Sequence, residues 1–440
     1  MRRFHPPPAG RGMRPCVRMV EVVIGTHSVP RCKGNRTWSG ERGGSVAGWV
    51  CHTNRFLDKL LCKNRSVCDV EVVTRATDGD HRSIFPTFVS ASRKGVMVVA
   101  RQAVITEPFK AGVREVTLSD PAPNQILLAA EYSAISAGTE LAVYTGTHQW
   151  LKDPNLPDWK FPFRSGYSAA GRVLKVGKDF PGGFREGDRV SFPGNHASAE
   201  LLTVGHERCR VWPLPDTLSA EKAAVAVIAR YGFGASVRAG LTLGRSAAVL
   251  GLGIIGQFAL RCLIAAGASP VVGIDGVPMR RAAALAAGAD HCIDPSAGDA
   301  KDQLAAYLGT RGAELIADAT GVPDAIPTAM SLACDGGQVV VVGSPRGKAK
   351  EVNFYDDLHR RYIEVTGAHG NMLFEPAHTR LAGAWDMNKA QMWLLRALAA
   401  GRLSLAGLVT HTIAPEQLGD AYEGLLKDKD HYLGVLVKWV

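Results

Sequence analysis

The stretch Ala247-Ala-Val-Leu-Gly-Leu-Gly-Ile-Ile-Gly256 decides the fold of this chain. A short apolar run ending at Gly251 predicts a buried strand that enters a tight turn, and the apolar residues after Gly256 recur at helical spacing. Gly251 permits the turn, Gly253 lets a pyrophosphate approach the backbone, and Gly256 allows close helix–strand packing. The free N–H groups at the helix N-terminus favour phosphates. The stretch therefore predicts a dinucleotide-binding turn.

An acidic residue follows at the distance that this kind of turn requires. Asp275 lies 19 residues beyond Gly256 and ends the next apolar run, residues 270–275. A carboxylate at the tip of the second strand accepts hydrogen bonds from both ribose hydroxyls of adenosine, and it repels the additional phosphate of NADP. We therefore predict NAD as the cofactor. The alternative is a glycine-rich turn that binds nothing, and the flanking strand, helix and acid argue against it.

Further cofactor contacts are expected on both sides of this turn. Ile255 belongs to the first turn of the helix, and Arg280 follows Asp275 at the start of the next helix, where it would flank the adenosine or form part of a solvated helix face. Ligands of open parallel sheets bind at the carboxyl ends of the strands. The residues expected there are Thr320, Gly321, Gly343 and Ser344.

Length and composition indicate a globular protein with more than one domain. The chain has 440 residues, 46% hydrophobic and 21% charged, which are usual values for soluble proteins. No apolar run reaches the roughly 18 residues of a membrane-spanning helix. Four of the nine cysteines, Cys209, Cys262, Cys292 and Cys334, are scattered without paired spacing. They indicate buried thiols in a reducing compartment, so we expect a cytoplasmic protein without a membrane partner.

The positive charge is confined to residues 1–96. That segment has 17 Lys/Arg and 7 Asp/Glu, whereas residues 97–440 have 34 of each sign. A basic nucleic-acid surface is therefore not expected on the folded part. The segment has three interpretations: upstream sequence read through from an early start codon with Met97 as the natural start, a disordered basic arm, or a targeting or metal-binding segment. We favour the first and expect no order in residues 1–96.

The rest of the chain has the pattern of an α/β protein. Residues 97–218 predict an antiparallel β-rich domain with Gly/Pro turns. Residues 219–403 alternate strands with helices, which is typical of a parallel sheet covered on both faces, and residues 404–440 are expected to complete the first domain. Strands are predicted at 102–107, 115–118, 125–134, 169–176, 199–204, 247–250, 271–275, 315–320, 338–343, 363–367 and 434–439, and helices at 219–239 and 389–400.

This order of domains resembles the medium-chain dehydrogenase/reductase superfamily. The resemblance covers residues 97–440 and is carried by Gly138-Thr-Glu140, Gly166-Tyr-Ser168, Gly187-Asp-Arg-Val190, Gly251-Leu-Gly-Ile-Ile-Gly256 and Thr320-Gly321. It implies a GroES-like catalytic domain, a Rossmann domain with a doubly wound parallel sheet, and an active site in the cleft between them.

The chain departs from that superfamily at the zinc ligands. Ala137 stands at the place of the catalytic cysteine, Tyr167 and Ser168 replace the Gly-His-Glu pair, and the third ligand region falls near Val227. Zinc needs three or four N, S or O ligands, so we predict a site without metal. Ser136–Glu140, Gly166-Tyr167 and Asn195-His-Ala197 resemble a zinc-lacking branch that includes bacteriochlorophyllide hydroxyethyl dehydrogenases and the first domain of certain bi-domain oxidoreductases. That resemblance implies oxidation of a secondary alcohol.

Without zinc, side chains must stabilise the developing alkoxide and move its proton. His196 is a candidate because imidazole titrates near neutrality, and Tyr167, at the former zinc-ligand position, can donate to an alkoxide or carbonyl oxygen. Thr139 is a candidate for a hydrogen bond to substrate or ribose, and Glu140 for orienting Arg or His. For each residue the alternative is a purely structural role.

The leading hypothesis is a zinc-independent, NAD-dependent oxidoreductase that transfers a hydride between a secondary alcohol and NAD. Its partners would be a small alcohol or carbonyl substrate and further copies of the same chain, without nucleic acid. The alternatives are a quinone or enoyl reductase that uses NAD(P)H, and a protein that binds NAD without turnover. Asp275 argues against the reductase, because such relatives usually prefer NADPH.

Overall fold

The structure is a computed structural model that describes residues 70–73, 88–92, 95–206, 209–349, 351–370, 372–375 and 385–440. Most of residues 1–96, for which the sequence predicts no order, lie outside the described residues. The chain divides into two compact units, Met1–Val99 with Thr117–Asp120, and Ala100–Val116 with Pro121–Val440. In the first unit, β1 (Val70–Val73) pairs antiparallel with β2 (Phe88–Ser92), and β2 pairs with the opening residues of β3 (Gly95–Glu107).

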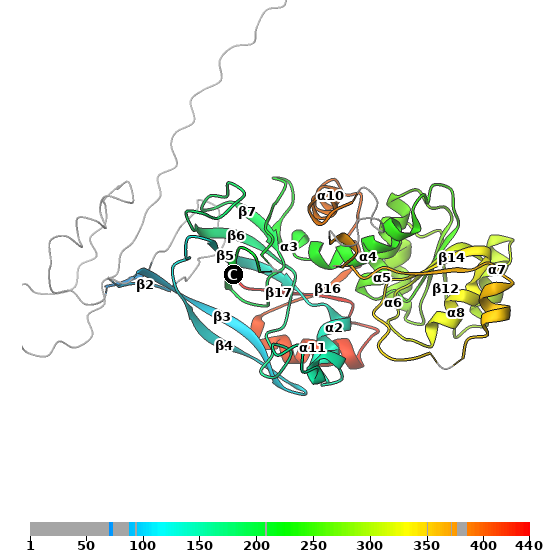
Figure 1. Ribbon diagram of the computed structural model, residues 1–440, viewed down its shortest axis with the longest axis horizontal. Coiled ribbons are helices and arrows are strands. Elements are labelled where there is room, and N and C mark those ends of the chain that lie inside the picture. The colour runs from blue at the N-terminus through cyan, green and yellow to red at the C-terminus, as the bar shows by residue number, and fades with distance from the viewer. Residues whose placement is uncertain are drawn as a thin grey trace, which may run out of the picture. The chain divides into compact units, whose positions relative to one another are not determined.

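A seven-stranded, mainly antiparallel sheet forms the β-rich part of the second unit. Its strand order is β16-β17-β5-β6-β7-β9, and β8 pairs with β5. The last strand of the chain, β17, thus pairs with β5, and β16 lies on the other side of β17 (Figure 1). In this pairing Val437 of β17 lies opposite Ser133 of β5. The bounds are β4 (Lys110–Leu118) outside this sheet, then β5 (Gln125–Ala134), β6 (Ala169–Val176), β7 (Arg189–Phe192), β8 (Ala199–Thr203), β9 (Trp212–Pro213), β16 (Val409–Ile413) and β17 (Gly434–Lys438).

The second sheet is parallel throughout its six strands, in the order β12-β11-β10-β13-β14-β15. The order reverses between β10 and β13, which is where open α/β sheets bind ligands. The α/β class with a β-rich part and a parallel sheet is therefore confirmed. The strands are β10 (Ala247–Leu250), β11 (Val271–Ile274), β12 (His291–Ile293), β13 (Ala313–Asp318), β14 (Ala333–Val341) and β15 (Glu364–Gly367).

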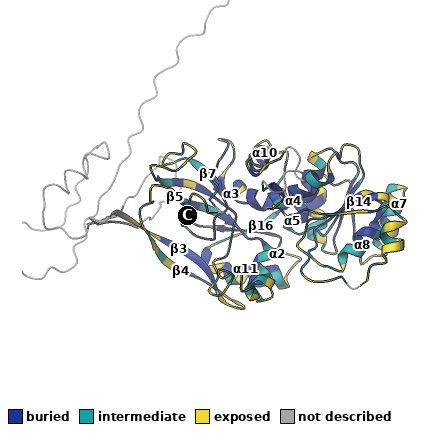
Figure 2. Ribbon diagram, viewed as in Figure 1, coloured by how far each residue is buried: buried dark blue, intermediate teal, exposed yellow. Residues whose placement is uncertain are grey.

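Apolar residues cover both faces of the parallel sheet. On β10, Ala247 and Val249 belong to a core with Leu260, and Ala248, on the opposite face, belongs to a core with Leu332. Side chains alternate between faces along a strand, so each residue of β10 is packed by a helix on one side or the other. Figure 2 shows this burial in α4 and α5, whereas the outer surface of α7 is exposed.

The helices that cover the sheets are mostly short. No helix in the described ranges combines the length and the apolar character needed to cross a membrane. The bounds are α2 (Ala137–Tyr144), α3 (Ala220–Ala223), α4 (Ala226–Ala239), α5 (Ile254–Ala265), α6 (Pro278–Ala286), α7 (Ala300–Leu308), α8 (Ala325–Leu332), α10 (Met387–Ala399) and α11 (Leu418–Lys427), with single turns η1 (Gln149–Lys152), η2 (Phe354–His359), η3 (Met372–Phe374) and η5 (Pro415–Gln417).

The prediction of one helix over residues 219–239 is wrong in its middle. The helix starts as expected, because the Ser219 side chain accepts a hydrogen bond from the Lys222 amide at 3.3 Å. It then divides into α3 and α4. The hydroxyl of Ser168 donates to the Ala224 carbonyl, so this carbonyl is bonded across the fold instead of along a continuous helix.

Candidate active site

The predicted glycine turn joins β10 to α5. Gly251 has a φ of +84°, a left-handed conformation that glycine adopts without strain. A Cβ on Gly256 would overlap the Gly251 carbonyl oxygen, whereas a Cβ on Gly253 would meet no atom within 4 Å. The helix therefore packs tightly on the turn while the backbone at Gly253 faces open space. No side chain caps the start of α5, so its first amides can receive a phosphate. Ile255 is half-buried in this first turn.

Asp275 follows β11 and is held beside the turn by backbone amides. Its Oδ2 accepts a hydrogen bond from the Leu252 amide at 2.8 Å, and its Oδ1 accepts from the Val277 amide at 2.8 Å. The Arg280 guanidinium lies 3.6 Å from Oδ2. Each carboxylate oxygen has a second lone pair, so the fixed carboxylate can still accept a ribose hydroxyl. Arg281 pairs instead with Asp294 at 2.9 Å.

The four residues predicted at later strand ends lie at the carboxyl ends of β13 and β14. The Thr320 hydroxyl donates to Asp318 Oδ1 at 2.7 Å. A Cβ on Gly343 would overlap the Gly321 backbone, and a Cβ on Gly321 would lie 3.3 Å from the Ser344 carbonyl oxygen. Two glycines thus let two loops touch, and this contact holds the loops beside the glycine turn on the neighbouring strand β10.

His196 and Glu140 lie in a buried hydrogen-bond network of the β-rich part. His196 Nε2 is 2.9 Å from Glu140 Oε2, and His196 Nδ1 is 2.7 Å from Ser133 Oγ. Tyr422 of α11 donates to the same carboxylate at 2.6 Å, and the Trp439 indole donates to Ser133 at 2.9 Å. The imidazole of His196 is fully buried, and both of its ring nitrogens have partners.

The direction of these hydrogen bonds follows from the groups at the two ends. The Trp439 indole can only donate, so Ser133 Oγ accepts from it, and the same oxygen also hydrogen-bonds to Nδ1 of His196. At the other end a carboxylate oxygen accepts, so Nε2 of His196 donates to Glu140. Every polar group in this chain of hydrogen bonds has a partner, which makes the network a rigid support.

Tyr167 and Thr139 lie on the accessible side of this support. The Tyr167 hydroxyl hydrogen-bonds to the Ser136 hydroxyl and to Thr139. Its ring is half-buried against Tyr231 of α4, with 5.6 Å between centroids, and Tyr231 lies 6.4 Å from the His369 ring. Burial raises the pKa of Tyr167 well above 10, so the phenol is protonated at neutral pH.

Ser136 connects the two groups, because its amide donates to Glu140 Oε1 at 2.8 Å. The structure therefore brings all four predicted catalytic residues into one region. Tyr167 and Thr139 are partly exposed there, whereas Glu140 and His196 are buried beneath them. The sequence prediction missed Ser136, although it is part of the quoted motif. It also missed Ser133, Tyr422 and Trp439, for which no local pattern exists.

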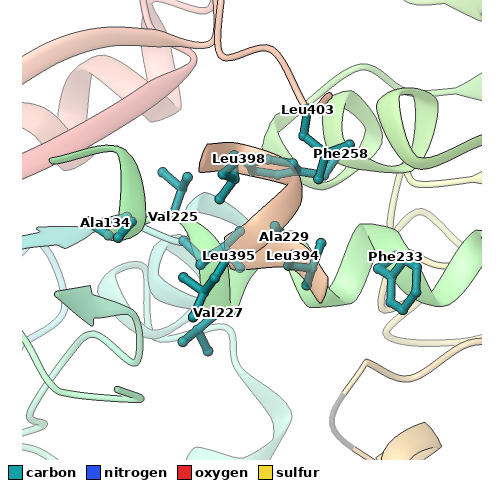
Figure 3. Packing of buried hydrophobic residues seen from close by; sticks show 14 of the residues in the cluster. Ala134, Val225, Val227, Ala229, Phe233, Phe258, Leu394, Leu395, Leu398 and Leu403 are labelled. Carbon is teal, nitrogen blue, oxygen red and sulfur yellow. The ribbon is translucent and has the colours of Figure 1, made fainter. Parts of the chain in front are cut away.

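The positions at which zinc relatives have ligands do not fit a metal here. Ala137 opens α2, and the Ser168 hydroxyl is bonded to the Ala224 carbonyl. Val227 is buried in an apolar core that also contains Leu394 and Leu395 (Figure 3). In the parts of the chain that the structure describes, no three His, Cys, Asp or Glu side chains form a group that could hold a metal.

Arg346 is a further residue that the sequence prediction missed. It follows the crossing point of the two loops at Gly343, and its Nη1 donates to the Gly138 carbonyl at 3.2 Å. The only sequence signal is a cation three residues after Gly343. Arg346 thus extends from the parallel-sheet part to the helix that carries Thr139 and Glu140.

Comparisons with known proteins agree with this geometry. Residues 255–387 match the family described as Zinc-binding dehydrogenase. The chain is 30% identical over 355 residues to 2-desacetyl-2-hydroxyethyl bacteriochlorophyllide A dehydrogenase of Cereibacter sphaeroides, covering 76% of this chain and 97% of that relative.

Two solved structures share the fold and contain nicotinamide cofactors. A protein of Sinorhizobium meliloti 1021 bound to NADP has a TM-score of 0.63 and 20% identity over 77% of this chain and 99% of its own. A short chain alcohol dehydrogenase of Escherichia coli in complex with NADH has a TM-score of 0.64 and 17% identity over the same shares. From the sequence match, the fold and the glycine turn together, the chain belongs to the medium-chain dehydrogenase/reductase superfamily and is an oxidoreductase of that superfamily.

Proposed function

We propose that this protein transfers a hydride between a secondary alcohol and NAD without a metal ion. The observation that carries the proposal is the pairing of a complete dinucleotide turn with ligand positions occupied by Ala137, Tyr167 and Val227. The name of the Cereibacter sphaeroides relative supports the substrate class, because a hydroxyethyl group that stands in place of an acetyl group and can be oxidised to it is a secondary alcohol. We also propose the division into residues 97–218, 219–403 and 404–440.

NAD would accept the hydride, and residues of this chain would bind and orient the cofactor. The first amides of α5 and the open backbone at Gly253 would receive the pyrophosphate. Asp275 would accept the ribose hydroxyls with the lone pairs that the backbone amides leave. A 2′-phosphate would bring negative charge against a carboxylate, which supports NAD over NADP.

Tyr167 would take the place of a metal at the substrate oxygen. Its phenol is protonated at neutral pH and can donate a hydrogen bond to a developing alkoxide or to a carbonyl oxygen. Ser136 and Thr139 bond to the same hydroxyl and so aim it. Glu140 holds the Ser136 backbone, and His196 holds Glu140, which makes these two buried residues positioning residues in this proposal.

Oxidation of secondary alcohols by protein treated with EDTA tests the proposal. We expect NADH to form when the protein is given NAD and a panel of polyols, sugars and aromatic secondary alcohols, with no stoichiometric zinc by elemental analysis. Added zinc should not raise the rate, because Ala137 and Val227 have no ligand atom and the Tyr167 and Ser168 hydroxyls are bonded to other protein groups. Bound zinc with activity lost on its removal would contradict the proposal. So would reduction of C=C bonds alone, or cofactor binding without any hydride transfer.

Replacing Asp275 by serine is expected to weaken NADH binding about tenfold and to strengthen NADPH binding. The change removes one charge-assisted pair of hydrogen bonds and the repulsion of a 2′-phosphate, each worth about 1–3 kcal/mol. Fluorescence titration of both nucleotides measures the two affinities. Asp294→Ser, which removes a half-buried carboxylate paired with Arg281, is the control. Tighter NADPH than NADH binding by the unchanged protein would overturn the role of Asp275.

We further propose a cytoplasmic homo-oligomer. β15 is an edge strand of the parallel sheet, and it is preceded in the chain by Phe354 and Tyr362, with 72% and 82% of their surface exposed. Large exposed apolar side chains at a sheet edge favour association. The molar mass in solution would decide the oligomeric state.

A further inference from the structure

Arg346 carries a positive charge and has no role in the proposed hydride transfer. It lies in the loop after β14, three residues beyond the glycine contact between Gly343 and Gly321. Its side chain is half-buried, and Nη1 donates to the backbone carbonyl of Gly138 at 3.2 Å. Gly138 immediately precedes Thr139, so the guanidinium lies next to the proposed catalytic residues.

The groups around Arg346 leave its charge uncompensated. Among the described residues, no Asp or Glu forms an ion pair with Arg346, whereas Arg210, Arg281 and Arg361 each have a carboxylate within 3.0 Å. The charged or titratable groups that interact with it are the Tyr167 phenol and the His148 imidazole. Burial lowers the pKa of His148 to about 4, so this imidazole is neutral at pH 7.

A half-buried guanidinium without a counter-ion raises the free energy of the folded protein, and a bound anion would offset this penalty. Taking charge out of water is unfavourable, and burial accordingly lowers the pKa of Arg346. One of its five N–H donors is used by the Gly138 carbonyl. The remaining donors form the flat fork that matches the oxygen atoms of a carboxylate or phosphate.

We infer that Arg346 binds a negatively charged group, a carboxylate or a phosphate, on the alcohol substrate. This inference rests on the proposed function and adds the substrate class to it. The alcohol end of the substrate would meet the Tyr167 hydroxyl while the anionic end meets the Arg346 fork. Since Arg346 follows β14 of the parallel sheet and Tyr167 precedes β6 of the antiparallel sheet, a substrate that contacts both is held at two points and oriented.

Matched pairs of alcohols test this inference. For the carboxylate, 3-hydroxybutyrate is compared with 1,3-butanediol, and for the phosphate, glycerol 3-phosphate is compared with glycerol. We expect the charged member of at least one pair to have a kcat/KM about 10- to 100-fold higher, the usual effect of a hydrogen-bonded charge pair. The pair that shows the preference distinguishes carboxylate from phosphate. Equal rates within both pairs would overturn the inference and leave the proposed function standing.

The variant Arg346→Gln should remove this preference. The glutamine keeps a donor for the Gly138 carbonyl but has no charge, so kcat/KM for the anionic alcohol should fall about 10- to 100-fold, with little change for the neutral partner. Arg346→Lys keeps the charge without the fork and should retain part of the preference. Arg311→Gln is the matched control, because that side chain is 80% exposed at an ion pair with Asp335.

Binding measurements separate this inference from the proposed function. Titration of the enzyme–NADH complex with 3-hydroxybutyrate or with glycerol 3-phosphate, followed by quenching of the NADH fluorescence, gives the affinity of each anion even when no alcohol is oxidised. We expect weaker anion binding in Arg346→Gln with an unchanged NADH dissociation constant. Loss of NADH affinity instead would assign Arg346 to the cofactor, and unchanged anion binding would exclude the substrate role. Absence of turnover together with Arg346-dependent anion binding would refute the proposed alcohol oxidation and would leave the anion-binding role of Arg346 standing.

Discussion

Replacement of Tyr167 by phenylalanine is expected to lower kcat for alcohol oxidation about 100- to 1,000-fold while NADH binding stays unchanged. The ring is half-buried against Tyr231, and phenylalanine keeps this packing. The variant removes only the hydroxyl that Ser136 and Thr139 hold. A donor that stabilises an alkoxide acts mainly in the transition state, so its loss appears in kcat more than in KM.

The control for this variant is Tyr307→Phe. Tyr307 stacks on His291 with 4.5 Å between ring centroids and is 41% exposed, so it shares the chemistry of the substitution without the proposed role. Ser136→Ala should give a smaller loss than Tyr167→Phe, because the phenol would remain but lose one of the groups that aim it. Full activity in Tyr167→Phe would remove this residue from the mechanism and leave Thr139 and the buried network as the remaining candidates.

The nucleotide side of the site was largely predictable from sequence because it is local. Gly251, Gly256 and Asp275 lie within a short stretch of sequence, and each position has a requirement that its residue type meets. Gly251 adopts a positive φ, Gly256 allows close contact between helix and turn, and Asp275 places a carboxylate beside the turn. The strand at 247–250 is found with these bounds. Hydrophobic runs and turn glycines therefore suffice for this part.

The catalytic side was only partly predictable, since its contacts join distant residues. Tyr422 bonds to Glu140 across 282 positions, and Trp439 bonds to Ser133 across 306. No periodicity reports such a contact. The helix α2 was also missed, because Gly138 and Thr139 are poor helix formers in a short segment. Resemblance to a family pointed to Tyr167 and Glu140, but the division into an accessible pair and a buried pair needed the structure.

Replacement of Glu140 by alanine is expected to destabilise the protein by about 3–5 kcal/mol. Glu140 is 2% exposed and accepts from three donors: the Ser136 amide at 2.8 Å, His196 Nε2 at 2.9 Å and the Tyr422 hydroxyl at 2.6 Å. Each donor would stay buried without an acceptor. Unsatisfied buried donors cost about 1–3 kcal/mol each, partly offset by rearrangement. Urea unfolding measures the loss, and Glu186→Gln, an exposed glutamate, is the control.

Comparison of two milder variants shows whether the carboxylate is the centre of the network. Tyr422→Phe removes one donor and leaves Glu140 with two others, so it should cost only about 1 kcal/mol. Glu140→Gln keeps one acceptor oxygen and presents an amide to groups that donate, so it should fall between Tyr422→Phe and Glu140→Ala. Equal losses in all three variants would mean that packing around these side chains, rather than hydrogen bonding to the carboxylate, supports Ser136 and hence Tyr167.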